Sequence, residues 1–438
     1  MTRNFIKNVH GRKVRDSRGY PAIEVDIELR YGARGRASVP FGRSFANSKF
    51  IATQDRHFSL IGLEIENALH FIYEKIMPSL KGLDVRNQAQ IDSLLIGLDK
   101  TVYPEHIPKN AVVAASMAVT HAAAAAEKLP LWQYLGALLG LSNADTLPLP
   151  QVQIFGRARD TPQVDIKGFM ITAIGASSYA EALEWSAKVH HHALVMMLKT
   201  DRLRGVPDHG DFGPTFKNNE DGLEMVLRAI ESAKLKPGED VAIALDVSAS
   251  EFGENGQYRL AQAPRTLESD ELSGMLVDWV ERYPIVSVEN PLGNDDEEGL
   301  ARFTWAVGKR VQVVGDHLLN TRVNRALNIE PKKVCNAVLI DPNKLGTVTA
   351  SLTALKTIQK CGFGAIISGS YGETEDTTIL HLGVGWGVSQ LKFRSFGRSE
   401  RMIMWNEGLR VAEAISLSDE TLPRDGNLPP KKHFPWAR

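Results

Sequence analysis

The sequence of 438 residues is poor in cysteine and carries almost no net charge. Its 2 cysteines, Cys335 and Cys361, are too few for a disulfide framework and stand in no CxxC pattern, so we expect small buried hydrophobes in a reducing compartment. The 51 Lys and Arg residues face 52 Asp and Glu residues, a net charge of −1. This balance excludes a protein whose whole surface binds nucleic acid or an anionic membrane, but it says nothing about a local pocket.

Long hydrophobic runs are also missing. The most apolar stretch, residues 111–126, is rich in alanine, includes Ser116 and His121, and is shorter than the roughly 20 residues of a membrane-spanning helix. We therefore expect a buried helix there. The basic residues 1–16 contain no apolar segment of the kind found in a signal peptide. These absences predict a cytoplasmic protein that has no membrane partner.

The first part of the chain changes from a strand pattern to a helix pattern. In residues 22–30 apolar and charged residues alternate, which is typical of a strand with one exposed face. A glycine-containing turn at residues 32–35 leads into a second strand, so we expect an antiparallel hairpin. In residues 61–76 apolar residues recur every three or four positions, as on one face of a helix. Strands followed by helices predict an α+β domain, which we place at residues 1–140.

After Pro148 short apolar runs alternate with amphipathic helical segments. The runs are residues 151–155, 169–174, 241–246, 285–289, 311–316, 337–341 and 365–368, and the helical segments include residues 178–198, 219–233, 268–283 and 347–360. Continuous apolar strands separated by helices are typical of a parallel sheet buried on both faces. Seven or eight such units favour a closed (β/α)₈ barrel, an α/β fold, at residues 141–417. We expect the polar, proline-rich residues 418–438 to wrap the surface or to be mobile.

Three of these runs end in an acidic residue: Asp246, Glu289 and Asp316. In a barrel such strand ends lie side by side on the face where active sites form, and three carboxylates would repel one another without a cation between them. Ligation by oxygen alone suits Mg²⁺. A single acid is explained more simply as the cap of the following helix, but three in register favour a metal site. A fourth run ends in Asp341, which either joins this site, acts as a base, or forms a structural ion pair with Lys344.

Four longer motifs carry a resemblance to a known family. They are Asp16-Ser17-Arg18-Gly19 with Pro21, A-L-D-V-S-A-S-E-F at residues 244–252, G-E-T-E-D-T-T at residues 372–378 and R-S-E-R at residues 398–401. With these motifs in this order, the chain resembles enolase from about residue 5 to residue 416. The resemblance implies an N-terminal α+β cap domain, an enolase-type (β/α)₈ barrel and a homodimer or higher homo-oligomer. Enolases interconvert 2-phosphoglycerate and phosphoenolpyruvate with a base, an acid and Mg²⁺.

Part of the enolase site is present at the matching positions. The resemblance implies that Asp246, Glu289 and Asp316 bind Mg²⁺. Ser44 occupies the position of a ligand to a second metal ion, in a loop that carries bulkier residues here than in the family. Lys392 matches the lysine that holds the substrate carboxylate.

The residues that carry out the chemistry differ from the enolase pattern. The lysine base falls on Asp341, the glutamate acid on His209, and a loop histidine on Arg159. The phosphate-binding S-H-R-S has lost its histidine and arginine, which leaves Ser370 and Tyr371 as candidate substrate contacts. Loss of one general acid or base lowers a rate by about 10²–10⁴-fold. We therefore do not expect ordinary turnover of 2-phosphoglycerate.

Three functions stay open. The retained acids and Lys392 favour a divergent Mg²⁺-dependent enzyme, with lyase or enolpyruvyl-type chemistry on a small phosphorylated, phosphonate or carboxylate substrate. In that enzyme His209 is an acid or base at neutral pH, and Arg159 and Arg394 supply cations. The lost residues fit instead a non-catalytic enolase-like binding or regulatory protein. Residual phosphopyruvate hydratase activity would require a neighbour such as Lys344 to replace the base.

Overall fold

The computed structural model describes residues 4–40, 64–98, 108–141, 145–157, 164–207, 210–263, 265–316, 334–418 and 425–437. The chain forms two compact units, each assembled from three stretches. The first unit comprises Met1–Ala144, Asp341–Thr353 and Ser368–Gly387. The second unit comprises Asp145–Ile340, Ala354–Ile367 and Val388–Arg438.

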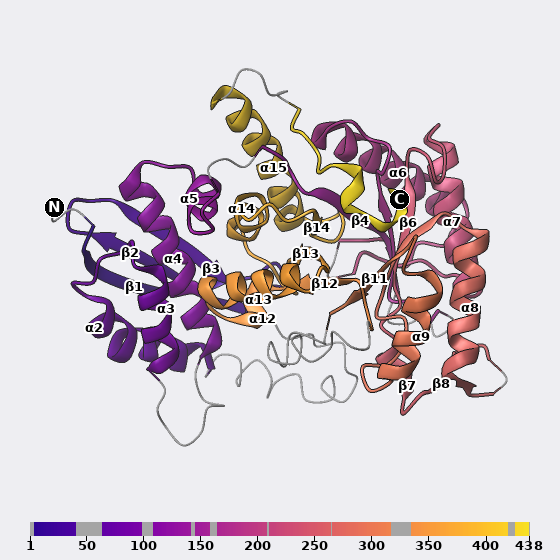
Figure 1. The fold of residues 1–438 in the computed structure, drawn as a ribbon, viewed down its shortest axis with the longest axis horizontal. Coiled ribbons are helices and arrows are strands. Elements are labelled where there is room, and N and C mark those ends of the chain that lie inside the picture. The colour runs from indigo at the N-terminus through magenta and orange to yellow at the C-terminus, as the bar shows by residue number, and fades with distance from the viewer. Residues whose placement is uncertain are drawn as a thin grey trace. The chain divides into compact units, whose positions relative to one another are not determined.

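The first unit contains a three-stranded antiparallel sheet in the order β1-β2-β3 (Figure 1). Its strands are β1 (Ile6–Arg15), β2 (Pro21–Leu29) and β3 (Arg34–Val39). The hairpin expected from the alternating pattern is confirmed as β2 and β3, whereas β1 was not predicted. The helices of this unit are α2 (Met77–Leu80) after a π-helical turn (Ile72–Ile76), α3 (Gln88–Gly97), α4 (Lys109–Glu127), α5 (Leu131–Ala137), α12 (Pro342–Leu345) and α14 (Thr378–Gly385).

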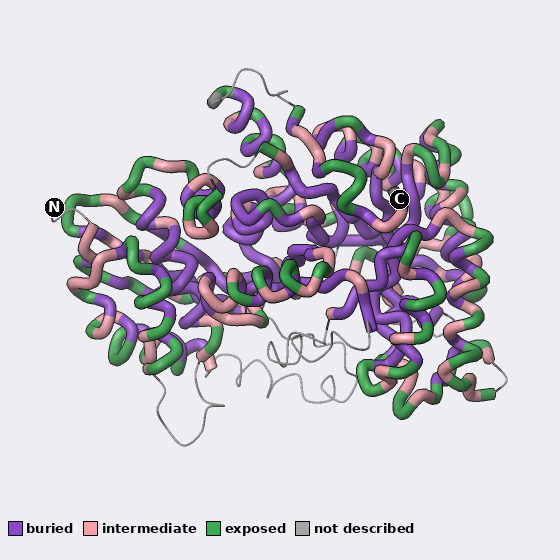
Figure 2. Tube along the Cα trace, viewed as in Figure 1, coloured by how far each residue is buried: buried purple, intermediate pink, exposed green. Residues whose placement is uncertain are grey.

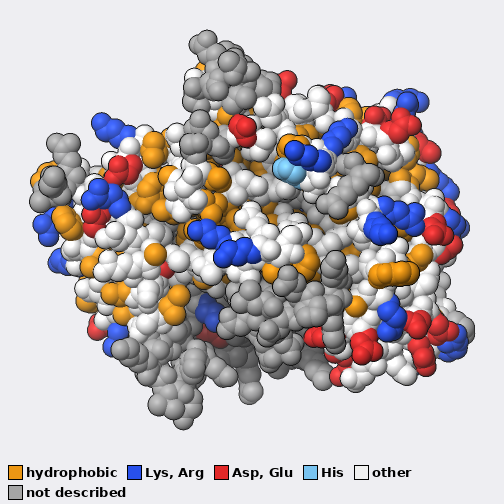
Figure 3. Space-filling model, viewed as in Figure 1, with side chains coloured by type: hydrophobic (Ala, Val, Ile, Leu, Met, Phe, Trp, Pro, Cys, Tyr) orange, Lys and Arg blue, Asp and Glu red, His pale blue; other side chains and the backbone are white. Residues whose placement is uncertain are grey.

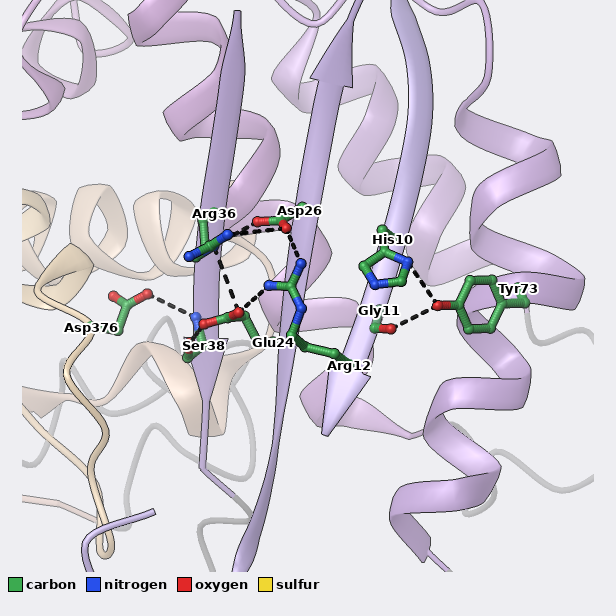
Figure 4. Close-up of polar contacts among 9 residues, drawn as sticks. All are labelled: His10, Gly11, Arg12, Glu24, Asp26, Arg36, Ser38, Tyr73 and Asp376. Carbon is green, nitrogen blue, oxygen red and sulfur yellow. Dashed lines mark hydrogen bonds and ion pairs between the residues drawn. The ribbon is translucent and has the colours of Figure 1, made fainter. Parts of the chain in front are cut away.

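A network of ion pairs covers the charged face of this sheet (Figure 4). The guanidinium of Arg12 contacts both Glu24 and Asp26, and Arg36 Nε donates to Asp26 Oδ1 at 2.7 Å. Burial raises the pKa of Asp26, but the hydrogen bonds from Arg36 and Arg12 outweigh it and hold that pKa below its ordinary value. Glu24 is only 5% exposed. The face of β2 that alternation predicts to be exposed is thus largely covered by arginine side chains.

Helix α4 is the buried helix expected in the alanine-rich stretch, and it packs against β2 and β3. A polar cluster lies on its inner side. Asp92 of α3 accepts hydrogen bonds from Ser116 Oγ at 2.6 Å and Gln88 Nε2 at 3.0 Å. Its other oxygen accepts from the backbone N–H of Thr349 at 2.8 Å, so this carboxylate ties residues 341–353 to the N-terminal helices. Burial outweighs these bonds and raises the pKa of Asp92.

Eight strands form a closed barrel, as expected from the apolar runs. They are β4 (Leu149–Gly156), β5 (Gly168–Thr172), β6 (Ala242–Asp246), β10 (Ile285–Glu289), β11 (Gln312–Gly315), β12 (Ala337–Ile340), β13 (Gly364–Ser368) and β14 (Gln390–Lys392). Except for Gly364, every residue in them is buried (Figure 2). Strands covered on both faces explain why most of the residues in these segments are apolar.

The expectation of a wholly parallel barrel is wrong at one strand. β5 runs antiparallel to both β4 and β6. A parallel connection needs a crossover of a dozen or more residues, and only residues 157–167 separate β4 from β5. The eighth strand, β14, was not predicted, because three residues of mixed polarity give no periodic signal.

Helices lie outside the barrel strands (Figure 1). They are α6 (Tyr179–Lys199), α7 (Asn219–Ser232), α8 (Ser269–Arg282), α9 (Glu297–Val307), α13 (Val348–Lys360) and α15 (Ser399–Ser418). The predicted start of α6 is confirmed, since Ser178 accepts a hydrogen bond from the N–H of Glu181. A small antiparallel sheet follows β6 and consists of β7 (Gly253–Glu254), β8 (Gln257–Tyr258) and β9 (Leu267–Glu268).

The last described residues lie against the second unit. Leu147 N donates to Asn427 O at 2.7 Å, and Tyr179 N donates to Gly426 O at 2.9 Å. Two short 3₁₀ turns follow, at Lys431–His433 and Pro435–Ala437. These hydrogen bonds attach the beginning of this segment to the start of β4 and of α6.

Neither cysteine forms a disulfide. Cys335 is buried as expected, whereas Cys361 is only half-buried. In the part of the chain that the structure describes, no helix is long and apolar enough to cross a membrane. Where described side chains are visible in Figure 3, those of both charge signs are interspersed.

Candidate functional site

Three candidate site residues lie outside the described residues. These are Ser44, Arg159 and His209. The metal loop, the loop arginine and the candidate acid or base therefore stay predictions. The other candidates are described, and they fall into one group in each unit.

Two predicted metal ligands lie side by side in the second unit. Asp246 is the last residue of β6 and Glu289 the last residue of β10, and the two are partners in the parallel register. Both are almost fully buried. Asp316 directly follows β11, the next strand of the barrel, and its backbone N–H donates to Asn290 Oδ1 at 3.1 Å. The barrel thus brings the predicted acids to adjacent strand ends, because parallel strands finish at the same edge.

Lys392 bridges the two buried carboxylates. It is the last residue of β14 and is fully buried. Its Nζ donates to Asp246 Oδ2 at 3.0 Å and to Glu289 Oε2 at 2.6 Å. Arg394, two residues further along, places Nη1 3.6 Å from the same Asp246 oxygen. The site therefore contains two acids and two cations in a buried environment.

The pKa values of the two acids are shifted in opposite directions. Burial raises the pKa of Asp246, but the positive charges of Lys392, Lys167 and Arg394 outweigh it and hold that pKa well below its ordinary value. Burial and the charge of Asp246 raise the pKa of Glu289 to about 7, although Lys392 acts against them. The repulsion between the two buried carboxylates therefore appears mainly as a raised pKa of Glu289. Binding of a proton or a further cation would relieve this repulsion.

The barrel brings together two of the carboxylates that are expected to bind Mg²⁺. Among the described residues, no three His, Cys, Asp or Glu side chains are grouped closely enough to hold a metal ion. Mg²⁺ needs fewer protein ligands, because it is commonly bound by one or two carboxylates and keeps water or substrate oxygens at its other positions. Asp246 and Glu289 fit this requirement in chemistry and in burial, and the raised proton affinity of Glu289 indicates that the pair can accept more positive charge.

Strained backbone is concentrated beside these ionisable residues. Seven described non-glycine residues have a left-handed backbone. Four of these are exposed, and the other three are buried: Ser248, Asn290 and Arg394, with φ of 50°, 47° and 71°. Each of the three lies within two residues of Asp246, Glu289 or Lys392. Such conformations are disfavoured for residues with a Cβ and gather at functional sites.

Two of the three left-handed residues hydrogen-bond to a predicted metal ligand, one at its carboxylate and one at its backbone. Ser248 Oγ donates to Asp246 Oδ1 at 2.7 Å. Asn290 accepts from the N–H of Asp316. Sequence patterns carry no information on the sign of φ, so these positioning residues could not be predicted.

Sequence reasoning also missed Asp211 in the second unit. This residue is completely buried, and its carboxylate lies where a side chain at Gly156 would be: a Cβ there would be 1.7 Å from Asp211 Oδ2. Burial raises the pKa of Asp211 to about 7, against the opposing charges of Arg394 and Arg401. In the sequence, the only feature that could have pointed to Asp211 is its position between two glycines in residues 210–213.

The first unit holds Asp341, which the sequence motifs predict to stand at the position of the family's base. Ser370 Oγ donates to Asp341 Oδ2 at 2.8 Å, and the N–H of Asn343 donates to Oδ1 at 3.1 Å, so Asp341 caps α12. Lys344 Nζ lies 3.8 Å from Oδ2. The contact expected for a structural ion pair is therefore present. The residues at positions 341 and 370 are complementary, because the Ser370 hydroxyl donates to both oxygens of the Asp341 carboxylate.

Two of the sequence motifs contact each other in this unit. Asp16 Oδ2 accepts from Arg18 Nη2 at 2.8 Å, and Ser17 N donates to the carbonyl of Glu373 at 2.9 Å. Gly372 has φ of +64°, and a Cβ there would lie 2.4 Å from Asp16 Oδ2. The D-S-R-G motif therefore supports the G-E-T-E-D-T-T segment.

The same segment is also anchored to the sheet. Asp376 Oδ2 accepts from the N–H of Ser38 at the end of β3 (Figure 4), at 2.8 Å. Its other oxygen accepts from the N–H of Thr378 at 2.7 Å. Ser370 N donates to the Glu373 carboxylate, so the candidate substrate contacts Ser370 and Tyr371 precede a firmly held turn.

Comparisons with known proteins agree with both units. The family described as "Enolase, N-terminal domain" matches residues 6–135, and "Enolase, C-terminal TIM barrel domain" matches residues 144–422. The chain is 39% identical over 417 residues to "Enolase 1" of Desulfitobacterium hafniense (strain Y51), covering 94% of each chain. It is 37% identical over 413 residues to "Enolase 2" of Pseudomonas syringae pv. syringae (strain B728a), covering 94% of this chain and 96% of that one.

These matches confirm the fold class predicted from the motifs, an N-terminal α+β domain followed by an enolase-type barrel in an α/β protein. They extend over nearly the whole length of this chain and of both relatives. The chain therefore belongs to the enolase family.

Proposed function

We propose that this protein is a divergent Mg²⁺-dependent enzyme that acts on a small anionic substrate other than 2-phosphoglycerate. The observation that supports this most is the buried pair Asp246 and Glu289, bridged by Lys392 at adjacent strand ends. Buried charges are expensive in folding free energy, and a hydrophobic replacement of the same volume is often as stable. A set of two buried acids and two buried cations is therefore better explained by a ligand than by stability.

The roles of the described residues follow from their charges. Asp246 and Glu289 would hold Mg²⁺, together with Asp316 from the neighbouring strand end. When bound, Mg²⁺ supplies a Lewis acid for an anionic oxygen of the substrate. Lys392, relieved of its two carboxylate partners, is then available to bind a substrate carboxylate. Ser248 would hold the carboxylate of Asp246, and Asn290 would hold the backbone of Asp316.

The first unit argues against ordinary enolase turnover. Asp341 stands where the family has its lysine base, and its oxygens accept hydrogen bonds from Ser370 and Asn343. Hydrogen bonds to a carboxylate favour the ionised form and weaken it as a base. Ser370 also replaces the phosphate-binding arginine. We assign proton transfer instead to His209 and contact with the anion to Arg159, as the sequence predicts.

A non-catalytic binding or regulatory protein is the second candidate. In its favour, the charged residues of both groups are already paired within the protein. Lys392 donates to both buried acids, and the Ser370 hydroxyl donates to Asp341, without any ligand. Residual phosphopyruvate hydratase activity is the third candidate, supported by the names of the two relatives.

Mg²⁺ titration by calorimetry separates the first two candidates. The enzyme requires Mg²⁺ binding at millimolar concentration or below, weakened about tenfold or more by Glu289→Gln, because a carboxylate ligand is lost. Glu254→Gln, at an exposed acid of β7 in the same unit, is the matched control and should leave binding unchanged. Absence of Mg²⁺ binding in the wild-type chain would favour the non-catalytic protein.

A direct assay of 2-phosphoglycerate turnover tests the third candidate. We expect a rate at least about 10²-fold below that of an ordinary enolase, because both proton-transfer residues are replaced. A rate within about tenfold would show that another residue serves as the base.

We also infer from family membership a homodimer or higher homo-oligomer located in the cytoplasm, without nucleic-acid or membrane partners. Light scattering after size exclusion tests the oligomeric state.

A further inference from the structure

Three strands of the barrel carry polar side chains that are almost completely buried. They are Ser287 of β10, Gln312 of β11 and Gln390 of β14. The interior of a barrel of this kind is normally filled by branched apolar side chains. Burying a hydroxyl or an amide costs free energy unless it is hydrogen-bonded, so these three residues need an explanation.

The three side chains form one hydrogen-bonded chain across the barrel. Ser287 Oγ donates to Gln312 Oε1 at 3.2 Å, and Gln312 Nε2 donates to Gln390 Oε1 at 2.7 Å. Ser287 and Gln312 are partners in the register of the neighbouring strands β10 and β11. Strands β11 and β14 are not neighbours, because β12 and β13 lie between them on one side of the barrel and β4, β5, β6 and β10 on the other. The hydrogen bond from Gln312 to Gln390 therefore crosses the barrel interior.

This chain of polar side chains lies one layer away from the buried ion pairs. Ser287 precedes Glu289 by two residues, and Gln390 precedes Lys392 by two residues. Residues two apart in a strand point to the same side, so each polar residue shares a face with the charged residue that follows it. Glu289 and Lys392 contact each other at 2.6 Å. Strands β10 and β14 are thus connected twice, through the charged pair and through the neutral chain beside it.

Stability alone does not explain the neutral chain. The Nε2 atom of Gln390 is buried and has no hydrogen-bond partner among the described residues, and such a donor lowers the free energy of unfolding. The chain does offer directional contacts between short side chains. Lys392, by contrast, has a flexible four-carbon stem, which by itself leaves the position of its strand open. The amide contact across the barrel is therefore suited to hold β14 at a defined position relative to β10 and β11.

We propose that Gln312 is a positioning residue of the buried site: through Gln390 it holds β14 where the ammonium group of Lys392 reaches both acids. The bridge over Asp246 and Glu289 is then a property of the barrel interior as well as of the two ion pairs. This inference deepens the proposed function and rests on it only for the role of Lys392 in the site. In the metal-free chain, the lysine neutralises the acids from a fixed position, and this is the arrangement that an entering metal ion has to displace.

The exchange of the Lys392 ammonium protons with water tests the proposal in the metal-free full chain. NMR of the chain labelled with ¹⁵N at lysine Nζ measures this exchange, and the Lys392 signal is identified by its loss in Lys392→Met. We expect a protected signal in the wild type, because protons held in buried hydrogen bonds exchange only when these bonds open. Gln312→Met should accelerate the exchange about fivefold or more at constant pH, since β14 loses its contact with β11.

A double variant separates positioning from stability. Gln312→Met leaves Gln390 Oε1 without its donor, so it should also lower the thermal midpoint. Gln312→Met with Gln390→Met replaces both partners by apolar side chains of similar size, so the midpoint should return toward that of the wild type. The contact across the barrel is still missing, so the Lys392 protons should still exchange about fivefold faster than in the wild type. The double variant decides the question even if the single variant does not fold.

A matched control removes a buried hydrogen bond elsewhere in the same unit. Thr304 Oγ1 of α9, outside the barrel strands, donates to the carbonyl of Val334 at 3.0 Å. Thr304→Val should lower the thermal midpoint, because this hydrogen bond is lost. It should leave the exchange rate of the Lys392 protons within about twofold of the wild-type rate, because the contact across the barrel is retained.

Each of four results would overturn the proposal. The Lys392 protons could exchange in Gln312→Met as in the wild type, or return to the wild-type rate in the double variant together with the midpoint. They could exchange as fast in Thr304→Val as in Gln312→Met, or they could be unprotected in the wild type. None of these measurements uses a metal ion. A chain that does not bind Mg²⁺ in calorimetry would therefore refute the proposed function and leave the positioning role of Gln312 standing.

Discussion

At the scale of single residues, the site is defined by how buried charges are balanced. Lys392 contacts two acids that differ in proton affinity, and Asp211 shares Arg394 and Arg401 as neighbouring cations. None of these pairings is evident from the order of residues in the chain. The sequence predicted the acids at the strand ends, because an acid after an apolar run is a local signal. It could not predict Asp211, whose burial depends on the missing side chain of Gly156.

The raised pKa of Asp211 predicts a particular pH dependence of stability. The ordinary value is 3.8 and the folded value about 7. Between these values the unfolded chain releases this proton while the folded chain keeps it. The contribution of Asp211 to the free energy of unfolding is therefore fully present below pH 3.8 and is lost as pH rises through 7. The loss is about 4 kcal/mol at most. Asp211→Asn cannot titrate, so it should gain stability relative to the wild type between pH 4 and pH 8.

Urea unfolding of both proteins at pH 4, 6 and 8 measures this gain. Other titrating groups are common to both chains and cancel in the difference. These include His190, whose pKa burial lowers to about 4. A difference between variant and wild type that does not change with pH would show that Asp211 keeps an ordinary pKa in the folded protein.

At the scale of elements, the periodic segments were predictable and the irregular ones were not. Helix α4 and the barrel strands were expected because burial imposes a pattern on ten or more residues, or on a continuous apolar run. The direction of β5 depends on the length of its connection to β4, and β14 is too short to show a pattern. The pairing of the D-S-R-G motif with residues 372–376 is a contact between distant parts of the chain, which only the fold reveals.

The polar cluster around Asp92 yields a prediction for the first unit. Asp92→Asn should lower the free energy of unfolding by about 1–3 kcal/mol, because an amide nitrogen cannot accept from both Thr349 groups that now donate to one oxygen. Hydrogen exchange at the Thr349 amide should accelerate as well. Gln90→Ala, at an exposed site of the same helix, should change neither quantity appreciably. Equal stability of Asp92→Asn and the wild type would mean that residues 341–353 are held by other contacts.

At the scale of the whole molecule, the family was predictable and the reaction was not. Long motifs in a fixed order identified the enolase fold, and the comparisons confirm it over both units. The sequence predicts that several residues of the enolase chemistry are replaced, so the family alone does not determine the activity. The activity we propose depends on contacts of single residues, such as Asp341 with Ser370 in one unit and Lys392 with Asp246 and Glu289 in the other.

The proposed function requires the carboxylate pair of the barrel to bind a divalent cation. Crystals of the full chain grown with Mn²⁺ in place of Mg²⁺ test it most directly, because the anomalous signal locates the ion. We expect an anomalous peak about 2.1 Å from oxygens of both Asp246 and Glu289, with Lys392 Nζ moved away from them. A map in which Lys392 still bridges the two carboxylates, with no anomalous peak beside them at saturating Mn²⁺, would show that the pair is not a metal site.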